Sequence, residues 1–472
     1  LGPPGARALG LGGAFTAVAD DSTAALANPA GLTNLTAPEV SVYVRYTDSD
    51  VLFLDPDAYN SALNANAGHT GKTFSDSSTD VSFASFVIPM EGVTFSGFYS
   101  NQLNFKGVQS APDLYMDDIV RQDPGFPDYQ NLDQYDNNNS LNAKVENIGL
   151  SAAFRFTDRL SGGLTVRHSS LNLKNQDTWR IDWWNDWETL MADDFFGPSN
   201  PDGFATMDQV REFLPVVNDT YIYNTAIDDK QTDLMLDLGL YYKGDQWSFG
   251  AVYHAGSKFT FDSQGSLSSN FSCNATNDGK ADVCQYWVDL LTDQGAIDIF
   301  YPNSDPITND VVIKLPAVVS LGAAFRPTDT WLLSFDANRV KYSSLNGPRS
   351  TTLGFLLDIN QFALNGGFYD PSIPSIAVTE EIEDEWTFHF GAEKSFFFDS
   401  GVLRNLSVRG GAYTVEDHDG IVATDNDDIV WTVGLGTIWG KNEIGAKLFQ
   451  VDLGASFADD VTNVVLSGIF RF

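Results

Sequence analysis

The sequence predicts an all-β protein, a transmembrane antiparallel β-barrel of about fourteen strands with an N-terminal luminal plug and long extracellular loops. Three observations support this fold. Apolar residues alternate with a period of two in segments of roughly ten residues, which is typical of barrel strands. Short turns and long connections follow one another along the chain. No uninterrupted run of about eighteen apolar residues is available to form a membrane-spanning helix.

The alternating segments can be placed along the chain. The last one is the plainest, because Val464, Leu466 and Phe470 fall on one face while Ser467 and Arg471 fall on the other. We expect strands near 38–47, 79–90, 92–106, 142–156, 159–174, 231–243, 246–262, 311–326, 330–343, 384–397, 403–415, 428–440, 443–457 and 461–472.

The connections between these segments sort by length. Short turns join every second pair, for example Met90-Glu91-Gly92 and Gly244-Asp245. Outer-membrane barrels have short turns on the periplasmic rim and long loops on the extracellular rim, whereas a soluble β-sandwich has no reason to sort its loops in this way. We therefore assign residues 38–472 to the barrel and predict long extracellular loops near 48–78, 107–141, 175–230, 263–310 and 344–383.

Residues 1–37 do not alternate. They contain the stretch LGLGGAFTAVADDSTAALANPAGLTNL, which is rich in small residues and nearly uncharged apart from Asp20 and Asp21. A barrel of this width has an interior that strand side chains cannot fill, so a channel or a plug is expected. We interpret 1–37 as a plug folded into the lumen. The alternative is an ordinary periplasmic tail, which we would expect to be more polar.

Charge and composition exclude several functions. The 472 residues carry 63 acidic and 27 basic side chains, a net charge of −36, so nucleic acid is not an expected partner. The five histidines form no metal-type pair, and no nucleophile elbow or phosphate-binding glycine loop occurs, so we expect neither an enzyme nor a cofactor. The acidic clusters near 416–419 and 425–428 lack the spacing of a Ca²⁺ loop, and we interpret them as solvated loop acid.

The two cysteines, Cys273 and Cys284, lie in the polar stretch FSCNATNDGKADVC. In an exported protein they predict one loop-closing disulfide, and in a cytosolic one they would be unrelated thiols or half of a metal site. No His or further Cys lies nearby in the sequence to complete zinc coordination. The chain opens at Leu1 without a basic and apolar leader, so we expect that an export signal has been removed or is not included.

Two stretches of the sequence are similar to a known family. Residues 5–32, GARALGLGGAFTAVADDSTAALANPAGL, resemble the hatch of the FadL-type outer-membrane transporters of long-chain fatty acids and aromatic hydrocarbons. Residues 315–343 resemble a strand pair near the middle of that barrel, and the ending on Phe472 resembles the signal read by the outer-membrane assembly machinery. The loops 107–141, 175–230 and 344–383 match nothing that can be aligned.

The resemblance implies a fourteen-stranded barrel closed by a hatch. It also implies ligand capture at extracellular loops, transfer to a site beside the hatch, and sideways exit through a gap at a kinked third strand. Relatives with the same opening motif have other roles, including that of a surface subunit of a protein secretion system, so the family predicts the fold better than the substrate.

The hatch contains candidate gating residues. Pro29 fixes its own backbone angle and disfavours helix at Asn28, so Asn28-Pro29-Ala30 makes a rigid break after an Ala-rich helical stretch. Gly12 and Gly13 are candidate hinges. A purely structural turn that anchors the plug to the wall is an equally good interpretation of the triplet.

Aromatic residues in two long loops are candidates for ligand capture. Trp179, Trp183 and Trp187 are spaced at i, i+4 and i+8, which would place three indoles on one helical stripe. Such a patch in an extracellular loop could form an apolar groove. The alternative is that the two loops simply pack together as a cap. The candidates are Trp179, Trp183, Trp184, Trp187, Phe196, Trp287, Leu290 and Phe300.

The strands contribute two further kinds of candidate. Four arginines, Arg45, Arg155, Arg167 and Arg409, fall on the face opposite the lipid-facing residues and could meet a ligand carboxylate. The alternative is that they are paired across the barrel, for example with Asp336 or Glu393. In the third strand, Gly97 precedes polar residues and could mark a lateral gap, although an ordinary extracellular strand end explains the polar residues equally well.

From these observations we expect passive outer-membrane transport of hydrophobic molecules, and of long-chain fatty acids in particular, with outer-membrane lipid as the surroundings. The first alternative is a non-transporting barrel that serves as a scaffold or secretion-system subunit for a protein partner. A general water-filled porin is disfavoured by the plug.

Overall fold

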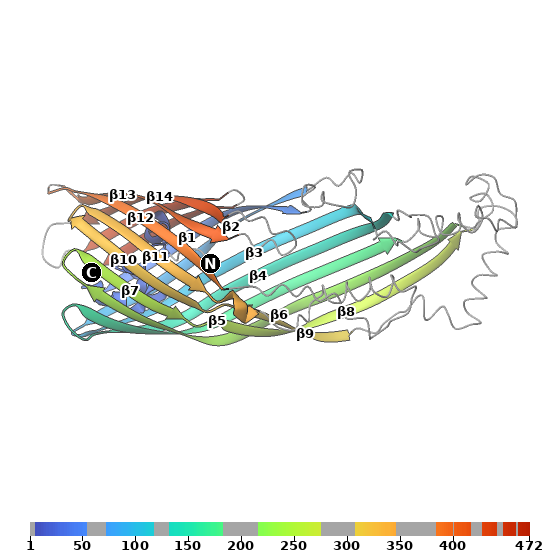
Figure 1. Cartoon of the computed structure of the whole chain (residues 1–472), viewed down its shortest axis with the longest axis horizontal. Coiled ribbons are helices and arrows are strands. Elements are labelled where there is room, and N and C mark those ends of the chain that lie inside the picture. Colours follow the sequence, from blue (N-terminus) through green and yellow to red (C-terminus); the bar gives the residue numbers. More distant parts are fainter. Residues whose placement is uncertain are drawn as a thin grey trace.

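The protein forms one closed antiparallel barrel in a computed structural model (Figure 1). The structure describes residues 5–53, 72–117, 132–182, 216–274, 307–345, 384–399, 401–416, 427–440, 447–458 and 461–472. Sixteen strand segments belong to a single sheet, and pairing of β5 with β6 closes it. The strands are β1 (Glu39–Phe53), β2 (Lys72–Met90), β3 (Val93–Asp117), β4 (Leu132–Arg155), β5 (Leu160–Asp182), β6 (Val216–Lys243), β7 (Trp247–His254), β8 (Ser257–Asn274), β9 (Ile307–Leu315), β10 (Val318–Thr328), β11 (Trp331–Val340), β12 (Glu385–Phe397), β13 (Leu403–Glu416), β14 (Asp427–Gly440), β15 (Leu448–Phe457) and β16 (Val461–Arg471).

The sixteen segments make fourteen passes of the barrel wall, because two passes are each broken in the middle. Only two residues separate β7 from β8, and only Pro316 and Ala317 separate β9 from β10. Pro316 has no N–H to donate to a ladder. Gly256 lies against it so closely that a Cβ there would be 2.5 Å from the carbonyl oxygen of Leu315. The two breaks therefore face each other, and the prediction of about fourteen strands is confirmed.

The outer face of the barrel is apolar. Large apolar side chains are exposed at alternate positions, such as Leu236, Leu238 and Leu240 on β6, and their neighbours Met235 and Asp237 are buried on the inside. This alternation is the one predicted from the sequence, and it provides the lipid-facing surface of a membrane barrel. No helix in the described part of the chain is long and apolar enough to cross a membrane.

Several strands are longer than the sequence predicted. β1, β2, β8 and β9 extend into the predicted loops 48–78 and 263–310, and β3 to β6 form a group of long neighbouring strands. β3 continues to Asp117, β4 begins at Leu132, β5 continues to Asp182 and β6 begins at Val216, and these strands extend well beyond β1 and β2 (Figure 1). The predicted loops 107–141 and 175–230 are correspondingly shorter. Outside the lipid neither face has to be apolar, so the strands lose the period-two signal, as at Lys174, Gln176 and Thr178.

One consequence concerns Trp179. It belongs to β5 and pairs with Asn137 on β4 and Tyr223 on β6. The helix that was predicted to begin at Trp179 is therefore wrong at its first residue, because Trp179 lies in a β-strand. Trp183 and Trp187 fall outside the described part of the chain.

Residues 5–38, which we call the N-terminal segment, lie inside the barrel. The segment contains the short helices α1 (Ala6–Gly10) and α2 (Ala24–Ala27) and the 3₁₀ helix η1 (Pro29–Asn34). α1 contacts strands β13 to β16, and η1 contacts β3 to β6 on another part of the wall. Nearly all of its side chains are buried. A small-residue segment can be buried in this way because its polar backbone finds partners in the wall, as described next.

Candidate functional site

Glycines of the wall receive the backbone of the N-terminal segment. They come as cross-strand pairs, in which the two glycines lie directly opposite each other on neighbouring strands. The pairs are Gly163 with Gly239, Gly250 with Gly322, Gly391 with Gly411, and Gly434 with Gly454. Between them they involve β5, β6, β7, β10, β12, β13, β14 and β15 and follow the segment around the lumen.

The approach at these pairs is too close for any side chain. A Cβ built at Gly454 would lie 2.2 Å from the carbonyl oxygen of Ala6, and one at Gly250 would lie 2.2 Å from that of Thr16. At Gly163 it would lie 2.2 Å from the backbone nitrogen of Ala30. The glycine pairs therefore act as sockets that let the segment's backbone lie directly against the wall. Sequence reasoning missed them, although glycine at inward positions of successive strands is a visible signal.

The predicted hinge glycines hold a fixed turn. Gly12 and Gly13 follow α1 with φ of 64° and 78°, in the left-handed region that favours glycine. The N–H of Gly13 donates to the carbonyl of Ala8 over 2.8 Å, and this closes the end of the helix. A Cβ on Gly12 would lie 2.4 Å from the carbonyl oxygen of Phe390 on β12. Both glycines are thus required by geometry in the docked segment.

The Asn28-Pro29-Ala30 triplet joins two parts of the segment to the wall. The Asn28 side chain is fully buried, and its Oδ1 accepts from the N–H of Ala30 over 3.1 Å. Its Nδ2 donates to the carbonyl of Thr16 over 2.9 Å and to that of Leu240 on β6 over 3.1 Å. A buried amide that makes all of these bonds is a fixed anchor. This geometry supports the anchoring interpretation of the triplet, and a gating role stays a prediction.

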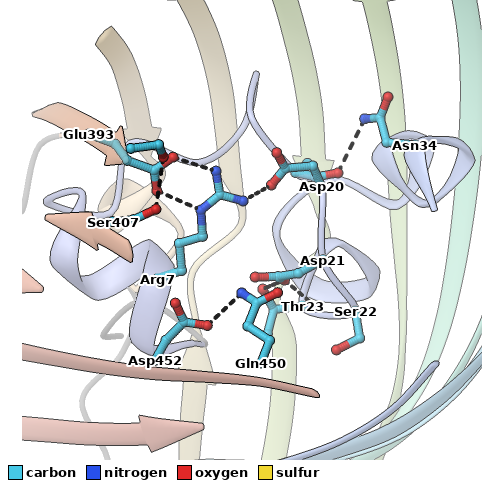
Figure 2. Close-up of polar contacts among 12 residues, drawn as sticks. Arg7, Asp20, Asp21, Ser22, Thr23, Asn34, Glu393, Ser407, Gln450 and Asp452 are labelled. Atoms are coloured by element: carbon cyan, nitrogen blue, oxygen red, sulfur yellow. Dashed lines mark hydrogen bonds and ion pairs between the residues drawn. The ribbon is translucent and has the colours of Figure 1, made fainter. Parts of the chain in front are cut away.

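Arg7 connects the N-terminal segment to the adjacent barrel wall by charge (Figure 2). Its guanidinium forms an ion pair with Asp20 in the segment and donates from Nε and Nη2 to Glu393 on β12, over 3.0 and 3.1 Å. Glu393 also accepts from Nε of Arg409 on β13 over 2.6 Å. Arg409 continues to Asp452 on β15 over 2.8 Å. The result is one buried chain of alternating charges, in which each charge has a partner.

Two more carboxylates of the wall hold the segment. Asp336 on β11 accepts from the backbone N–H groups of Phe15 and Thr16, both over 2.8 Å. Asp336 therefore binds backbone N–H groups of the N-terminal segment, whereas the sequence indicated it as a partner for a luminal arginine. Glu39 accepts from the N–H of Ser22 over 3.0 Å and from Arg471 over 2.8 Å. Backbone N–H groups that would be orphaned in the lumen are satisfied in this way.

The four arginines proposed as ligand partners already have contacts. Arg167 forms a buried ion pair with Asp237 over 2.6 Å, and Arg409 bridges Glu393 and Asp452. Arg155 donates to the carbonyl of Thr33 over 2.8 Å. Arg45 is half-buried and lies opposite Asp80 in the β1–β2 ladder. The alternative that these cations are paired within the barrel, including Arg409 with Glu393, is thus the one the geometry favours.

The wall is interrupted between β2 and β3. Their ladder ends at the pair Phe83 and Ser100, although both strands continue beyond it. Just above, β3 has a bulge between Asn101 and Leu103 in its ladder with β4. A bulge bends a strand and turns it away from its partner. Across the opening the side chain of Asn104 donates to that of Asp80.

Gly97 lies three residues below this point. It pairs regularly with Phe86 on β2 and Leu150 on β4. The ring of Phe86 covers it on the outer face, where a Cβ would lie 2.6 Å from the ring. The third strand is thus the interrupted one, but the distortion sits at Asn101 to Leu103 and not at Gly97.

Three buried aromatic side chains stand at the foot of the interruption. Tyr43, Phe83 and Phe98 come from β1, β2 and β3, with ring centroids 5.4 Å apart for the first pair and 5.7 Å for the second. They pack with Leu26 and Leu32 of the N-terminal segment. We call Tyr43, Phe83 and Phe98 the aromatic trio. Alternation places them inward but does not show that they meet, so the sequence did not identify them.

Polar atoms without partners lie beside the trio. Ser82 Oγ, Asn101 Oδ1 and Asn147 Oδ1 are buried and have no hydrogen-bond partner within the described ranges. Buried polar atoms are normally satisfied, so such a group calls for water or a ligand. The foot of the interruption thus combines apolar rings with free polar groups.

A second apolar cluster lies higher in the extended part of the barrel. Its buried members are Val145, Leu171, Leu173, Ile227, Phe259 and Phe261, from β4, β5, β6 and β8. The ladder of β6 is interrupted beside it. β6 pairs with β8 over Val216–Ala226 and with β7 over Asp237–Lys243, and residues 227–236 lie between these two ladders. On a strand an inward apolar residue and a lipid-facing one give the same sequence signal, which is why this cluster was missed.

Most of the predicted capture residues fall outside the described part of the chain. These are Trp183, Trp184, Trp187, Phe196, Trp287, Leu290 and Phe300. Cys273 lies in β8, where its backbone pairs with Val217, and Cys284 also falls outside. Capture by these loops and the disulfide therefore stay predictions.

The fold and the lumen together define a membrane-spanning β-barrel channel with an internal plug-like segment. The chain belongs to the outer membrane protein transport protein (OMPP1/FadL/TodX) family, whose model matches residues 128–395, more than half of the chain. It is therefore an outer-membrane protein of a family of transport channels for hydrophobic compounds. A sequence search of curated proteins gives no significant match.

Solved structures share the fold at low sequence identity. A Pseudomonas aeruginosa FadL homologue is 12% identical with a TM-score of 0.56, and the match covers 99% of this chain and 98% of that one. The P. putida toluene transporter TodX is 12% identical with a TM-score of 0.50, covering 99% and 98%. The CymD monoaromatic hydrocarbon channel is 13% identical with a TM-score of 0.50, covering 99% and 97%. Likeness at this identity supports the architecture and leaves the substrate open.

Proposed function

We propose that the protein passes long-chain fatty acids across the outer membrane by diffusion, with the N-terminal segment as a hatch and with sideways exit between β2 and β3. The observation that carries this proposal is the end of the β2–β3 ladder beside the aromatic trio. An opening in the wall can serve as an exit only if it connects the lumen with the lipid. The aromatic trio lies on the luminal side of the opening and provides an apolar surface there.

The outer surface beside the opening is apolar, so the opening also borders the lipid. Val81 on β2 and Ile148 on β4 flank the interruption, and both are exposed on the outside among the lipid-facing residues. A hydrophobic molecule leaving the trio at this height would therefore enter lipid without crossing water. Each CH₂ group kept out of water contributes roughly 0.8 kcal/mol, so a dry sideways route suits an acyl chain.

The route to the trio would begin in the upper apolar cluster of Val145, Leu171, Leu173, Ile227, Phe259 and Phe261. This cluster lies on the strands that extend outward, between the extracellular loops and the row of Ser100, Asn147 and Ser169. It offers an apolar surface on the way from the loops to the interruption. In this proposal, the loop tryptophans named above deliver the ligand to the cluster.

The N-terminal segment closes the route toward the periplasm. Its α1 half is fixed by the glycine sockets and by the ion pairs of Arg7. The buried cluster that contains the trio also contains Leu26 and Leu32 of the α2–η1 half and Ala6 and Leu9 of α1. We therefore assign gating to a shift of the N-terminal segment away from the trio.

A second candidate function is transport of neutral aromatic hydrocarbons. It is favoured by the arginines, since Arg155, Arg167 and Arg409 are all engaged with groups of the protein. A carboxylate would have to displace one of these contacts, whereas a neutral ring would not. Two of the solved structures with this fold are described as a toluene transporter and a monoaromatic hydrocarbon channel.

Photo-crosslinking distinguishes these proposals. Purified, delipidated protein would be incubated with a diazirine analogue of a long-chain fatty acid, with or without excess toluene, and the labelled peptides would be mapped. We expect saturable label on Phe83 and Phe98, which face inward. Phe86 and Leu150 lie on the same or adjacent strands but face lipid, so they serve as internal controls.

Each outcome has a consequence. Label confined to Phe86 and Leu150 would contradict the luminal route. Direct binding of toluene without binding of fatty acid would replace the first candidate by the second. If neither ligand binds, the scaffold alternative becomes the working hypothesis, and the experiment to follow is isolation of a protein partner.

A further inference from the structure

A group of cations lies on the outer surface at the upper edge of the apolar belt. Lys258 is at the start of β8, Lys314 is near the end of β9, and Arg339 and Lys341 are at the end of β11. Directly below them the outward side chains are apolar, for example Tyr253 on β7 and Leu333 on β11, and both are exposed. The four cations, which we call the basic rim, therefore lie where lipid headgroups of the outer leaflet would begin.

The composition of the basic rim is unlike that of the chain. The whole protein has 63 acidic and 27 basic side chains, yet within the described ranges the rim has four cations and two contacting carboxylates, Asp384 and Asp233, which gives a charge of 4 − 2 = +2. Asp233 accepts from the backbone N–H of Lys258 over 2.9 Å. Asp384 accepts from Arg339 over 3.2 Å and from the hydroxyl of Ser343 over 2.6 Å. Two carboxylates do not neutralise four cations, so the rim keeps a positive charge.

Two of the cations oppose each other directly. Lys258 and Lys314 are cross-strand partners in the β8–β9 ladder, and their neighbours Phe259 and Ile313 belong to the inner apolar cluster, so both lysines are on the outer face. Like charges directly opposite on a sheet destabilise the pair. An anion bound between them would remove that repulsion. Higher on the same two strands, Asp262 opposes Asp310, which limits the rim on its extracellular side.

Two of the four cations, Lys314 and Arg339, are held in place. Lys314 donates from Nζ to the carbonyl of Ser344 over 2.8 Å, in the short 3₁₀ helix η2 (Tyr342–Leu345) that follows Lys341. The guanidinium of Arg339 lies 5.9 Å from the ring centroid of Trp386, which is exposed on β12. A fixed arginine over an interfacial tryptophan and a fixed lysine make a preorganised surface for phosphate.

We propose that the basic rim binds the phosphate groups of a phosphorylated lipid of the outer leaflet. The apolar belt beneath the rim would contact the acyl chains of the same lipid, and the rim would contact its headgroup. Basic pockets next to apolar membrane-facing surface bind phosphorylated headgroups in this way. The bound lipid would anchor β8, β9 and η2 beside the break between β7 and β8. This inference does not depend on which compound the channel transports.

The test compares two double variants with the same change of charge. Lys258→Gln/Lys314→Gln removes half of the basic rim. Lys144→Gln/Lys174→Gln removes two outward lysines on β4 and β5 that already pair with carboxylates, Glu146 over 2.9 Å and Asp228 over 3.0 Å. Each full-length protein is purified in detergent, titrated with lipid A and with the same lipid after removal of its phosphates, and examined by native mass spectrometry.

The proposal predicts that lipid A binds the unaltered protein and the Lys144→Gln/Lys174→Gln variant equally well. Binding to Lys258→Gln/Lys314→Gln should be roughly thirtyfold weaker, and removal of the phosphates should weaken binding to the unaltered protein by a similar factor. Equal binding of lipid A to both variants would overturn it, as would binding that ignores the phosphates. Intact barrel structure in both variants is checked by circular dichroism before titration.

Discussion

Single glycines decide how closely the N-terminal segment approaches the wall. Gly454 is opposite Gly434, and a Cβ there would lie 2.2 Å from the carbonyl oxygen of Ala6. We predict that Gly454→Ala weakens docking of α1 by about 1–3 kcal/mol, the usual cost of overpacking. Gly468→Ala is the control, because its nearest neighbour is the ring of Phe449 at 3.9 Å. Hydrogen exchange of the amides of residues 6–13 measures the effect, and equal protection in the two variants would refute the socket account.

A buried carboxyl makes docking depend on pH. Burial raises the pKa of Asp21 from 3.8 to about 6, against the opposing effect of the hydrogen bond from Thr23. A raised carboxyl pKa means that the docked segment binds the proton more tightly than the undocked one. Docking is therefore strongest at or below about pH 4, and it weakens as the pH rises to about 6, by an amount on the order of 3 kcal/mol.

The variant Asp21→Asn should remove this dependence. We expect the same protection of residues 20–35 at pH 5 and pH 7.5 in Asp21→Asn, whereas the unaltered protein loses protection at the higher pH. Asp245→Asn makes the same change of charge at an exposed turn and serves as the control. Unchanged pH dependence in Asp21→Asn would show that another group titrates.

The buried ion pairs should contribute far more than the exposed ones. Arg167 and Asp237 are buried, so Arg167→Met leaves the Asp237 carboxylate with His254 as its remaining side-chain partner and should lower the free energy of unfolding by about 3 kcal/mol. Arg159 pairs with Asp245 at an exposed turn, and Arg159→Met should cost less than about 1 kcal/mol. Urea unfolding in detergent, followed by tryptophan fluorescence, gives both values. Similar values for the two variants would contradict the assigned difference in burial.

At the scale of elements, the sequence predicted the parts of the strands whose outer face contacts lipid. Inside the apolar belt each strand needs apolar side chains on one face only, so β12 could be recognised from the alternation of Trp386, Phe388 and Phe390 and β16 from that of Leu466 and Phe470. Outside the belt this requirement ends, and the extensions of β3 to β6 carry Asn, Asp and Lys on both faces. The same reason explains why Trp179 was assigned to a helix. Alternation of apolar and polar residues therefore marks a strand only where its two faces have different surroundings, such as lipid on one side and the lumen on the other.

Breaks and interruptions of the wall were predicted less well. The third strand was expected to be distorted, and it is, but at Asn101 to Leu103 and not at Gly97. A bulge depends on the register between two strands, which a single strand does not encode. The break at Pro316 was visible as a proline in a strand, whereas its partner Gly256 is meaningful only because the two residues meet in space.

At the scale of the whole molecule, the contacts that fix the N-terminal segment join distant parts of the chain. Arg7 and Glu393 are 386 positions apart, and Phe15 and Asp336 are 321 apart. The sequence could indicate that a small-residue segment would be buried and that inward charges would be paired. It could not indicate which partners meet, because that depends on closure of all fourteen passes.

The central claim is that hydrophobic molecules leave the lumen between β2 and β3, and a cross-link tests it most directly. Asp80→Cys/Asn104→Cys places two cysteines where side chains already meet across the interruption. Lys106→Cys/Asn142→Cys places two in the intact β3–β4 ladder as the control. Uptake of labelled oleate and toluene by cells that express each variant is measured after oxidation and again after reduction. We predict that oxidation blocks uptake of at least one of the two ligands in Asp80→Cys/Asn104→Cys alone and that reduction restores it. Uptake of both ligands that continues unchanged through a fully oxidised cross-link would contradict the sideways route.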